Sequence, residues 1–168
     1  MTSQEFRQEI DIKRPRYFAK YYSLMDTISN KGSSGAGDYI KFGPFYQTYM
    51  YAFMIGYHLG ECNLISNSGE TKDFAPLNHW KPSDLVDYII MLILSESDDK
   101  LGFSWEDLEQ MNEEESKAAV SNIIRRIEGY ANTGLNYIQD KFNNEKDEFR
   151  SPQVFINFLR EVVDNKKQ

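Results

Sequence analysis

The chain has 168 residues, of which 40% are apolar and 14% aromatic, and its formal net charge is −7. This length suits one domain with a sizeable core, and the apolar content excludes a chain that stays disordered for want of apolar surface. A single cysteine, Cys62, excludes an intramolecular disulfide framework and a structural zinc site built from cysteines.

The first 14 residues are polar and end beside Pro15, and the residue before a proline favours an extended conformation. We therefore expect residues 1–14 to form a flexible N-terminal arm, followed by a single helical domain over residues 15–168. From Pro15 to Ser29, apolar and aromatic side chains recur at spacings of three and four, which predicts a helix. Residues 31–37 predict a flexible glycine-serine loop.

The segment from Pro44 to Gly60 is apolar or aromatic almost all round, which predicts a central helix surrounded by others. Gly56 lies inside it, where glycine costs roughly 1 kcal/mol relative to alanine. Close approach of a neighbouring helix would compensate for that cost, and Gly60 suits the helix C-cap. Residues 62–80 hold several turn residues and predict a long irregular connection, of a length typical of functional loops.

Helical spacing of apolar residues predicts three further helices, over about residues 82–95, 112–138 and 152–165. A weakened capping box that begins at Ser104 predicts a short helix up to Met111. No stretch alternates with the period of a strand. The predicted fold class is therefore all-α, a single compact domain of five or six helices with a long loop at about residues 62–80.

The acidic residues are concentrated in the middle of the chain. Residues 61–115 carry 14 acidic and three basic side chains, a net charge of −11, whereas the segments on either side are weakly positive. A solvated helical face would explain this pattern, and an acidic patch that binds a basic partner or imitates nucleic acid is the alternative.

The sequence predicts a cytoplasmic protein without a membrane span. Its N-terminus has no apolar run of signal-peptide length. The most apolar stretch, Leu85 to Leu94, is half as long as the roughly 20 residues that a membrane span needs.

Signals for catalysis are weak. His58 and Cys62 are one helical turn apart, but a zinc site needs two further ligands. The chain contains no Gly-x-Ser-x-Gly, His-Glu-x-x-His or Gly-x-Gly-x-x-Gly motif. We therefore predict no catalytic residue, no metal and no cofactor, and an enzyme with a site near His58 under the 62–80 loop is one alternative.

Basic and aromatic residues interleave in the first predicted helix, and the long helix adds two adjacent arginines. Such side chains can grip phosphates and stack on bases, so direct nucleic-acid binding is a second alternative. Tyrosines near His58 could instead line a protein interface, where tyrosine is enriched. The candidate residues for binding a protein partner or nucleic acid are Lys13, Arg14, Arg16, Lys20, Tyr46, Tyr57, His58, Arg125 and Arg126.

Residues 42–64 read Phe-Gly-Pro-Phe-Tyr-Gln-Thr-Tyr-Met-Tyr-Ala-Phe-Met-Ile-Gly-Tyr-His-Leu-Gly-Glu-Cys-Asn-Leu. This string resembles the signature of small helical proteins encoded beside bacterial DNA-phosphorothioation (Dnd) and related phage-defence systems. The resemblance implies an accessory or regulatory component rather than a stand-alone enzyme. The positions that carry it are Phe45, Tyr49, Ala52, Phe53, Gly56 and Tyr57.

These observations predict a non-enzymatic helical accessory or interaction subunit of a larger bacterial assembly, of the DNA-acting or phage-defence kind. Its partner would be another protein or a second copy of the chain. The main alternative is a nucleic-acid-binding module that uses the basic first helix together with Arg125 and Arg126.

Overall fold

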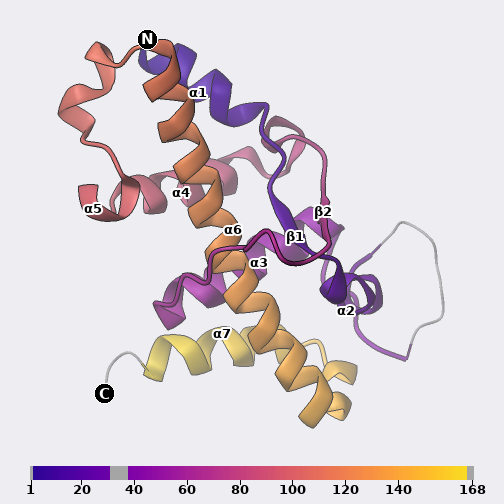
Figure 1. Ribbon diagram of the computed structural model, residues 1–168. Helices are drawn as coiled ribbons and strands as arrows, with labels where there is room; N and C mark the ends of the chain where they lie inside the picture. The colour runs from indigo at the N-terminus through magenta and orange to yellow at the C-terminus, as the bar shows by residue number, and fades with distance from the viewer. Residues whose placement is uncertain (1, 31–37, 166–168) are drawn as a thin grey trace. The chain divides into compact units, whose positions relative to one another are not determined.

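The computed structural model describes residues 2–30 and 38–165. Figure 1 shows a helical protein with one small sheet, formed by β1 and β2, and the predicted all-α class is confirmed. The predicted loop at 31–37 lies outside the described residues. The α-helices are α1 (Ser3–Asp11), α2 (Tyr22–Ile28), α3 (Phe45–Leu59), α4 (Ser83–Leu94), α5 (Asp98–Leu101), α6 (Glu113–Asn144) and α7 (Val154–Asp164). The strands are β1 (Arg16–Phe18) and β2 (Thr71–Asp73), and the 3-10 helices are η1 (Ala19–Tyr21), η2 (Leu77–His79), η3 (Trp105–Gln110) and η4 (Lys146–Arg150).

By their internal contacts the residues form two compact units. The first unit comprises residues 1–16 and 73–127, and the second comprises residues 17–72 and 128–168. The chain passes from one unit to the other within β1, within β2 and in the middle of α6.

The first unit packs α1 and α4 with the N-terminal part of α6. Apolar side chains at helical spacing form its core, because one stripe of each helix is buried. The stripes comprise Phe6 and Ile10 of α1, Val86, Ile89, Ile90 and Ile93 of α4, and Ala119, Val120 and Ile123 of α6. The end of α1 is joined to η2 by a hydrogen bond from the Leu77 backbone N–H to the Lys13 carbonyl oxygen (3.0 Å).

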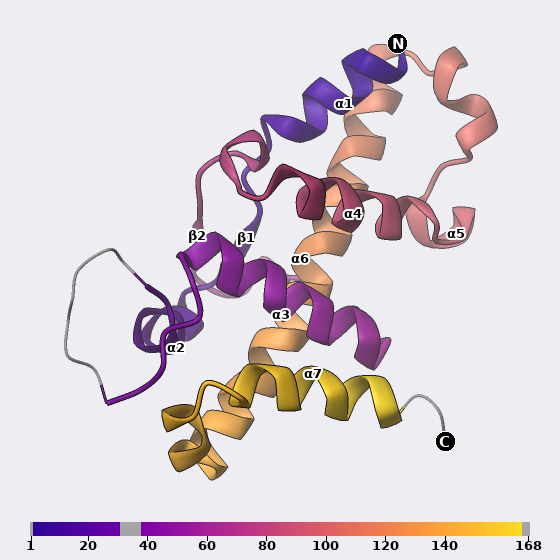
Figure 2. The ribbon, with the colours of Figure 1, turned by 180° about the vertical axis from the view of Figure 1, so that it is seen from behind.

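The second unit is built around α3, whose side chains are buried on almost every side, as its sequence predicts. α7 runs beside α3 in both views (Figures 1 and 2). The two helices are joined by the Tyr51 hydroxyl, which donates to the Phe155 carbonyl oxygen (2.7 Å). The C-terminal part of α6 crosses α3 so closely that a Cβ on Gly56 would lie 1.9 Å from the Tyr130 carbonyl oxygen. This close approach of α6 is the predicted compensation for the cost of a glycine inside the helix.

Two N-terminal predictions are wrong. Residues 1–14 do not form an arm, because Ser3–Asp11 is a helix that buries Phe6 and Ile10 in the first unit. A capping box starts it: the Glu5 backbone N–H donates to the Thr2 hydroxyl, and the Glu5 carboxylate accepts from the Thr2 backbone N–H. The helix predicted from Pro15 to Ser29 begins only at Tyr22, because residues 16–18 pair with β2 instead.

The remaining helices agree with prediction in position. α3, α4, α6 and α7 occupy the predicted segments, and Gly60 takes the left-handed conformation (φ 78°) of a C-cap. The segment after Ser104 is a 3-10 helix, and the Ser104 side chain does not cap it. The four residues of α5 form a helical turn between two segments that are predicted as helices.

Candidate functional site

The 3-10 helix η3 separates two hollows in the first unit. Because a 3-10 helix has about three residues per turn, side chains three apart share a face. Trp105 and Leu108 therefore face one hollow, and Ser104, Asp107 and Gln110 border the other. We call the first the apolar groove and the second the carboxylate pocket.

The apolar groove lies between α1, α4 and η3 and has a volume of about 310 Å³. Its walls are mostly aliphatic and aromatic, from Phe6, Ile10, Ile90, Met91, Leu94, Trp105 and Leu108. Two of these side chains are unusually exposed for their type, Met91 by 54% and Trp105 by 40%. A concave apolar surface with exposed methionine and tryptophan is typical of a binding site.

A hydrogen bond from the indole nitrogen and two aromatic contacts of the ring hold Trp105 in position. Its Nε1–H donates to the Leu94 carbonyl oxygen at the end of α4 (3.0 Å). Its ring meets those of Phe6 and Phe103 edge to face, with ring centroids 6.3 and 5.9 Å apart. The groove wall is therefore pre-organised, which lowers the entropy cost of binding.

Two charged side chains, those of Arg7 and Asp87, also line the groove. The Arg7 guanidinium forms ion pairs with Asp11 (2.8 Å) and Asp87 (2.6 Å), which tie α1 to α4. Partial burial opposes the charge on Arg7, but hydrogen bonds and charge interactions with the two carboxylates outweigh it and raise the pKa of the guanidinium. The only basic side chain among the lining residues is thus already neutralised.

The surroundings of the groove are acidic. The first unit contains 15 acidic and nine basic side chains, a net charge of −6, so it carries almost all of the chain's negative charge. On α4 and η3, two of the three elements that border the groove, the acidic side chains are all exposed, namely Asp84 and Asp87 of α4 and Glu106, Asp107 and Glu109 of η3. A cationic partner would be attracted to this unit.

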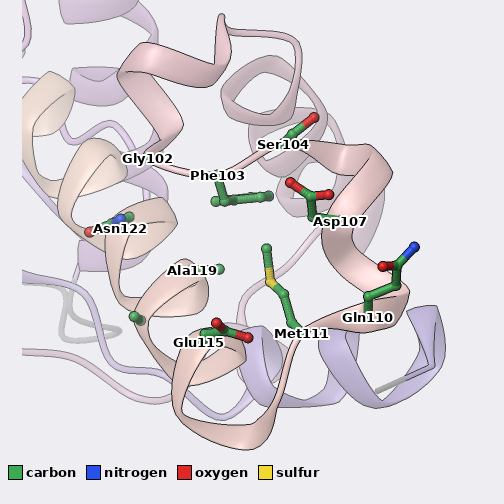
Figure 3. Close-up of a pocket in the computed structure, with 10 residues that line it drawn as sticks. Gly102, Phe103, Ser104, Asp107, Gln110, Met111, Glu115, Ala119 and Asn122 are labelled. Carbon is green, nitrogen blue, oxygen red and sulfur yellow. The ribbon is translucent and has the colours of Figure 1, made fainter.

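The carboxylate pocket has a volume of about 450 Å³ and lies between residues 102–111 and the first turns of α6. Figure 3 shows Phe103, Asp107 and Met111 pointing into the same space, which Ala119 faces from α6. Two carboxylates, those of Asp107 and Glu115, line it, and no lysine or arginine does.

Five of the sequence-predicted binding residues lie in the first unit. Lys13 lies 3.9 Å from the Glu9 carboxylate, Arg14 is exposed and Arg16 belongs to β1. Arg125 is exposed on α6, whereas Arg126 is paired with Glu96, its Nη2 donating to Oε1 at 2.9 Å.

The other four lie in the second unit, so the two groups are described apart. Lys20 is exposed, with its ammonium over the rings of Phe18 and Tyr21, and Tyr46 is half-buried. Tyr57 packs against Tyr130 with ring centroids 5.2 Å apart, and His58 lies beside it. That any of these residues binds a partner or nucleic acid stays a prediction.

The enzyme alternative centres on His58, which is half-buried on α3. Its Nδ1 lies 2.8 Å from the Met54 carbonyl oxygen one turn earlier, a contact that orients the ring along the helix. Cys62 lies against Gly129 of α6, where an added Cβ would be 2.6 Å from the sulfur. Among the described residues, no three His, Cys, Asp or Glu side chains are grouped so that they could hold a metal ion.

No protein-family model matches the chain, and no significant match was found among curated proteins or solved structures. None of the helices in the described ranges combines the length and apolar character that a membrane span requires.

Sequence reasoning missed the residues of the groove. Met91 and Leu94 read as ordinary core positions of an apolar helix, and Trp105 reads as part of a capping segment. The capping box at Thr2–Glu5, with Phe6 and Ile10 one turn apart, was the available signal for the helix that forms one wall.

Proposed function

We propose that this protein is a non-enzymatic interaction subunit that binds a basic, amphipathic helical segment of a partner protein in the apolar groove. The observation that carries the proposal is the groove itself, an apolar hollow with exposed Met91 and Trp105 on a unit of net charge −6. A helix with one apolar face and flanking lysines matches both properties.

The apolar and the acidic side chains of the site would have different roles in binding. Met91 is unbranched and polarizable, so it adapts to different apolar side chains, while the fixed indole of Trp105 provides a rigid wall. The carboxylates of α4 and η3 would attract lysine or arginine on the partner and speed association. Apolar anchoring would therefore set the affinity, and charge would set the selection among partners.

The proposal extends to the kind of assembly in which this subunit would act. The resemblance of residues 42–64 to accessory proteins of Dnd and related phage-defence systems supports a cytoplasmic subunit of a bacterial assembly that acts on DNA. The groove lies in the first unit, outside the segment that carries the resemblance. The partner-binding surface would therefore be a feature of this chain that the resemblance to those accessory proteins does not cover.

A synthetic amphipathic helix of leucine and lysine, about 18 residues or five turns long, tests the proposal. Its binding is measured by fluorescence anisotropy of a label on the peptide. Met91→Gln removes the apolar contact and should weaken binding about tenfold. Ile156→Gln is the matched control, because Ile156 is equally exposed (54%) but lies on α7 in the second unit.

Two further arms complete the test. A peptide with glutamate in place of lysine should bind far more weakly, and added salt should weaken the lysine peptide because exposed charges are screened. Equal binding of the two peptides, equal affinities of the Met91→Gln and wild-type proteins, or no binding of the lysine peptide would refute the proposal.

One observation favours nucleic-acid binding as a second candidate function. In the second unit, the ammonium of Lys72 in β2 lies 4.2 Å from the centre of the exposed Tyr22 ring, and the ammonium of Lys20 lies over two further rings. Cations beside aromatic rings are the elements of a single-strand binding surface. Lys20→Glu should then abolish salt-sensitive binding of a labelled oligonucleotide, and Lys100→Glu in the first unit should not.

A further inference from the structure

The carboxylate pocket holds a charged group that the fold does not use. Asp107 is exposed, and its carboxylate makes no hydrogen bond or ion pair with any other described residue. In Figure 3 it points into the pocket from η3, toward Met111 and the ring of Phe103. A carboxylate in this position is available to a ligand.

Two other polar residues of the pocket, Glu115 and Asn122, have structural partners. Glu115 closes the N-terminus of α6 in a capping box, with its Oε2 accepting from the Asn112 backbone N–H at 2.9 Å. Asn122 donates from Nδ2 to the Leu101 carbonyl oxygen at the end of α5 (3.1 Å). Of the two lining carboxylates, that of Asp107 is therefore the one available to a ligand.

The apolar side chains of the wall suit an alkyl chain. Phe103, Met111 and Ala119 face the pocket, and Ala118 is a further apolar residue of its lining. An aromatic ring beside a carboxylate favours cations, since the ring face attracts positive charge. The flexible thioether of Met111 can close over an apolar stem.

We propose that the carboxylate pocket binds an alkylammonium group, with the cation at Asp107 and its carbon chain along Phe103 and Met111. A lysine side chain of a partner protein and a free aliphatic diamine both carry this group. The volume of about 450 Å³ lies within the range of ordinary ligand pockets, and the two carboxylates of the lining favour a cation over an anion. The site faces away from the apolar groove across η3 and does not depend on the proposed function.

The experiment is a titration followed by amide chemical shifts, with three probes. Cadaverine represents the free diamine, Nα-acetyl-lysine amide represents the protein side chain, and Nα-acetyl-norleucine amide is the uncharged control. Saturable shifts of residues 102–122 with at least one cationic probe are expected, and none with norleucine. The tighter cationic probe identifies the source of the group.

Two variants and one control decide whether Asp107 is responsible. Asp107→Asn should weaken binding about tenfold or more, because a charge-assisted contact is lost. Ala118→Leu keeps the charge but fills the pocket from an exposed position, so it should also weaken binding. Asp99→Asn changes the net charge equally, on α5 and outside the pocket lining, and should bind as the wild type does.

The proposal is overturned if neither cationic probe shifts residues 102–122, or if norleucine amide shifts them as strongly. It is also overturned if Asp107→Asn binds like the wild type, or if Asp99→Asn loses as much affinity. Since all substituted side chains are exposed, thermal unfolding of each variant should remain close to that of the wild type.

Discussion

Gly134→Ala tests the closest helix crossing in the second unit. A Cβ added to Gly134 would lie 1.7 Å from the carbonyl oxygen of Ala52 and 2.5 Å from its carbonyl carbon. Non-bonded carbon atoms pack at about 3.5–4.0 Å, so α3 and α6 would have to move apart by roughly 1.5 Å. Such a shift would loosen side chains that are fully buried, such as Tyr49 and Phe53.

The expected loss of stability is the balance of two effects. Alanine gains about 1 kcal/mol over glycine in helix propensity. Overpacking against backbone atoms, which cannot rotate away, costs more than the usual range of about 1–3 kcal/mol. We expect Gly134→Ala to lower the free energy of unfolding by about 3 kcal/mol, measured by urea denaturation followed by far-UV circular dichroism.

Gly129→Ala is the internal control for this prediction. Its Cβ would meet the sulfur of Cys62 at 2.6 Å, which is the end of a side chain and can rotate. We expect a change below about 1 kcal/mol, relieved by Cys62→Ala. Wild-type stability of Gly134→Ala, or a larger loss in Gly129→Ala, would refute the close-packing explanation.

Three further outcomes follow from other contacts. Glu96→Gln should lower the free energy of unfolding by about 3 kcal/mol in urea denaturation, because it breaks the ion pair with Arg126. Both side chains of that pair are largely buried, with 6% of Glu96 and 13% of Arg126 exposed. Glu113→Gln, at an exposed ion pair, should change the free energy of unfolding by less than about 0.5 kcal/mol. Acrylamide should quench the exposed Trp105 but not the other, buried tryptophan, so Trp105→Phe should remove the quenchable fluorescence. Burial raises the pKa of Tyr137 to about 12 from 10.0, so the phenol ionises at lower pH in the unfolded chain than in the folded one. The free energy of unfolding should therefore fall between pH 10 and 12. Tyr137→Phe should reduce that fall, measured by unfolding curves at alkaline pH.

Local patterns were sufficient for the helices with strong periodicity. The all-round apolar sequence of α3 predicted its central place, and Gly56 inside it predicted a close neighbour. The C-cap at Gly60 followed from residue type alone, since glycine takes the left-handed conformation without a Cβ penalty.

Non-local pairing explains what local patterns could not predict. Residues 16–18 have the spacing of a helix, but they pair with residues 71–73, more than fifty positions away. The Ala19 backbone N–H donates to the Glu70 carbonyl oxygen at the end of this pairing (2.8 Å). Tertiary context thus overrides local preference.

The candidate site was less predictable than the fold. Burial decides whether an apolar residue is core or surface, and one sequence does not reveal which side of α4 is covered. Met91 and Ile93 are both apolar, yet Met91 is 54% exposed and Ile93 fully buried. Arg126 illustrates the converse, because a residue predicted to bind a partner is paired with Glu96, thirty positions away.

Photo-crosslinking tests the central claim most directly. The leucine-lysine peptide, with one leucine replaced by its diazirine analogue, is irradiated with the full-length protein, and the modified residues are identified by mass spectrometry. The proposal predicts crosslinks confined to α1, α4 and η3, within residues 3–11, 83–94 and 105–110. Crosslinks spread over residues 17–72 and 128–165, or unchanged in the Met91→Gln variant, would contradict it.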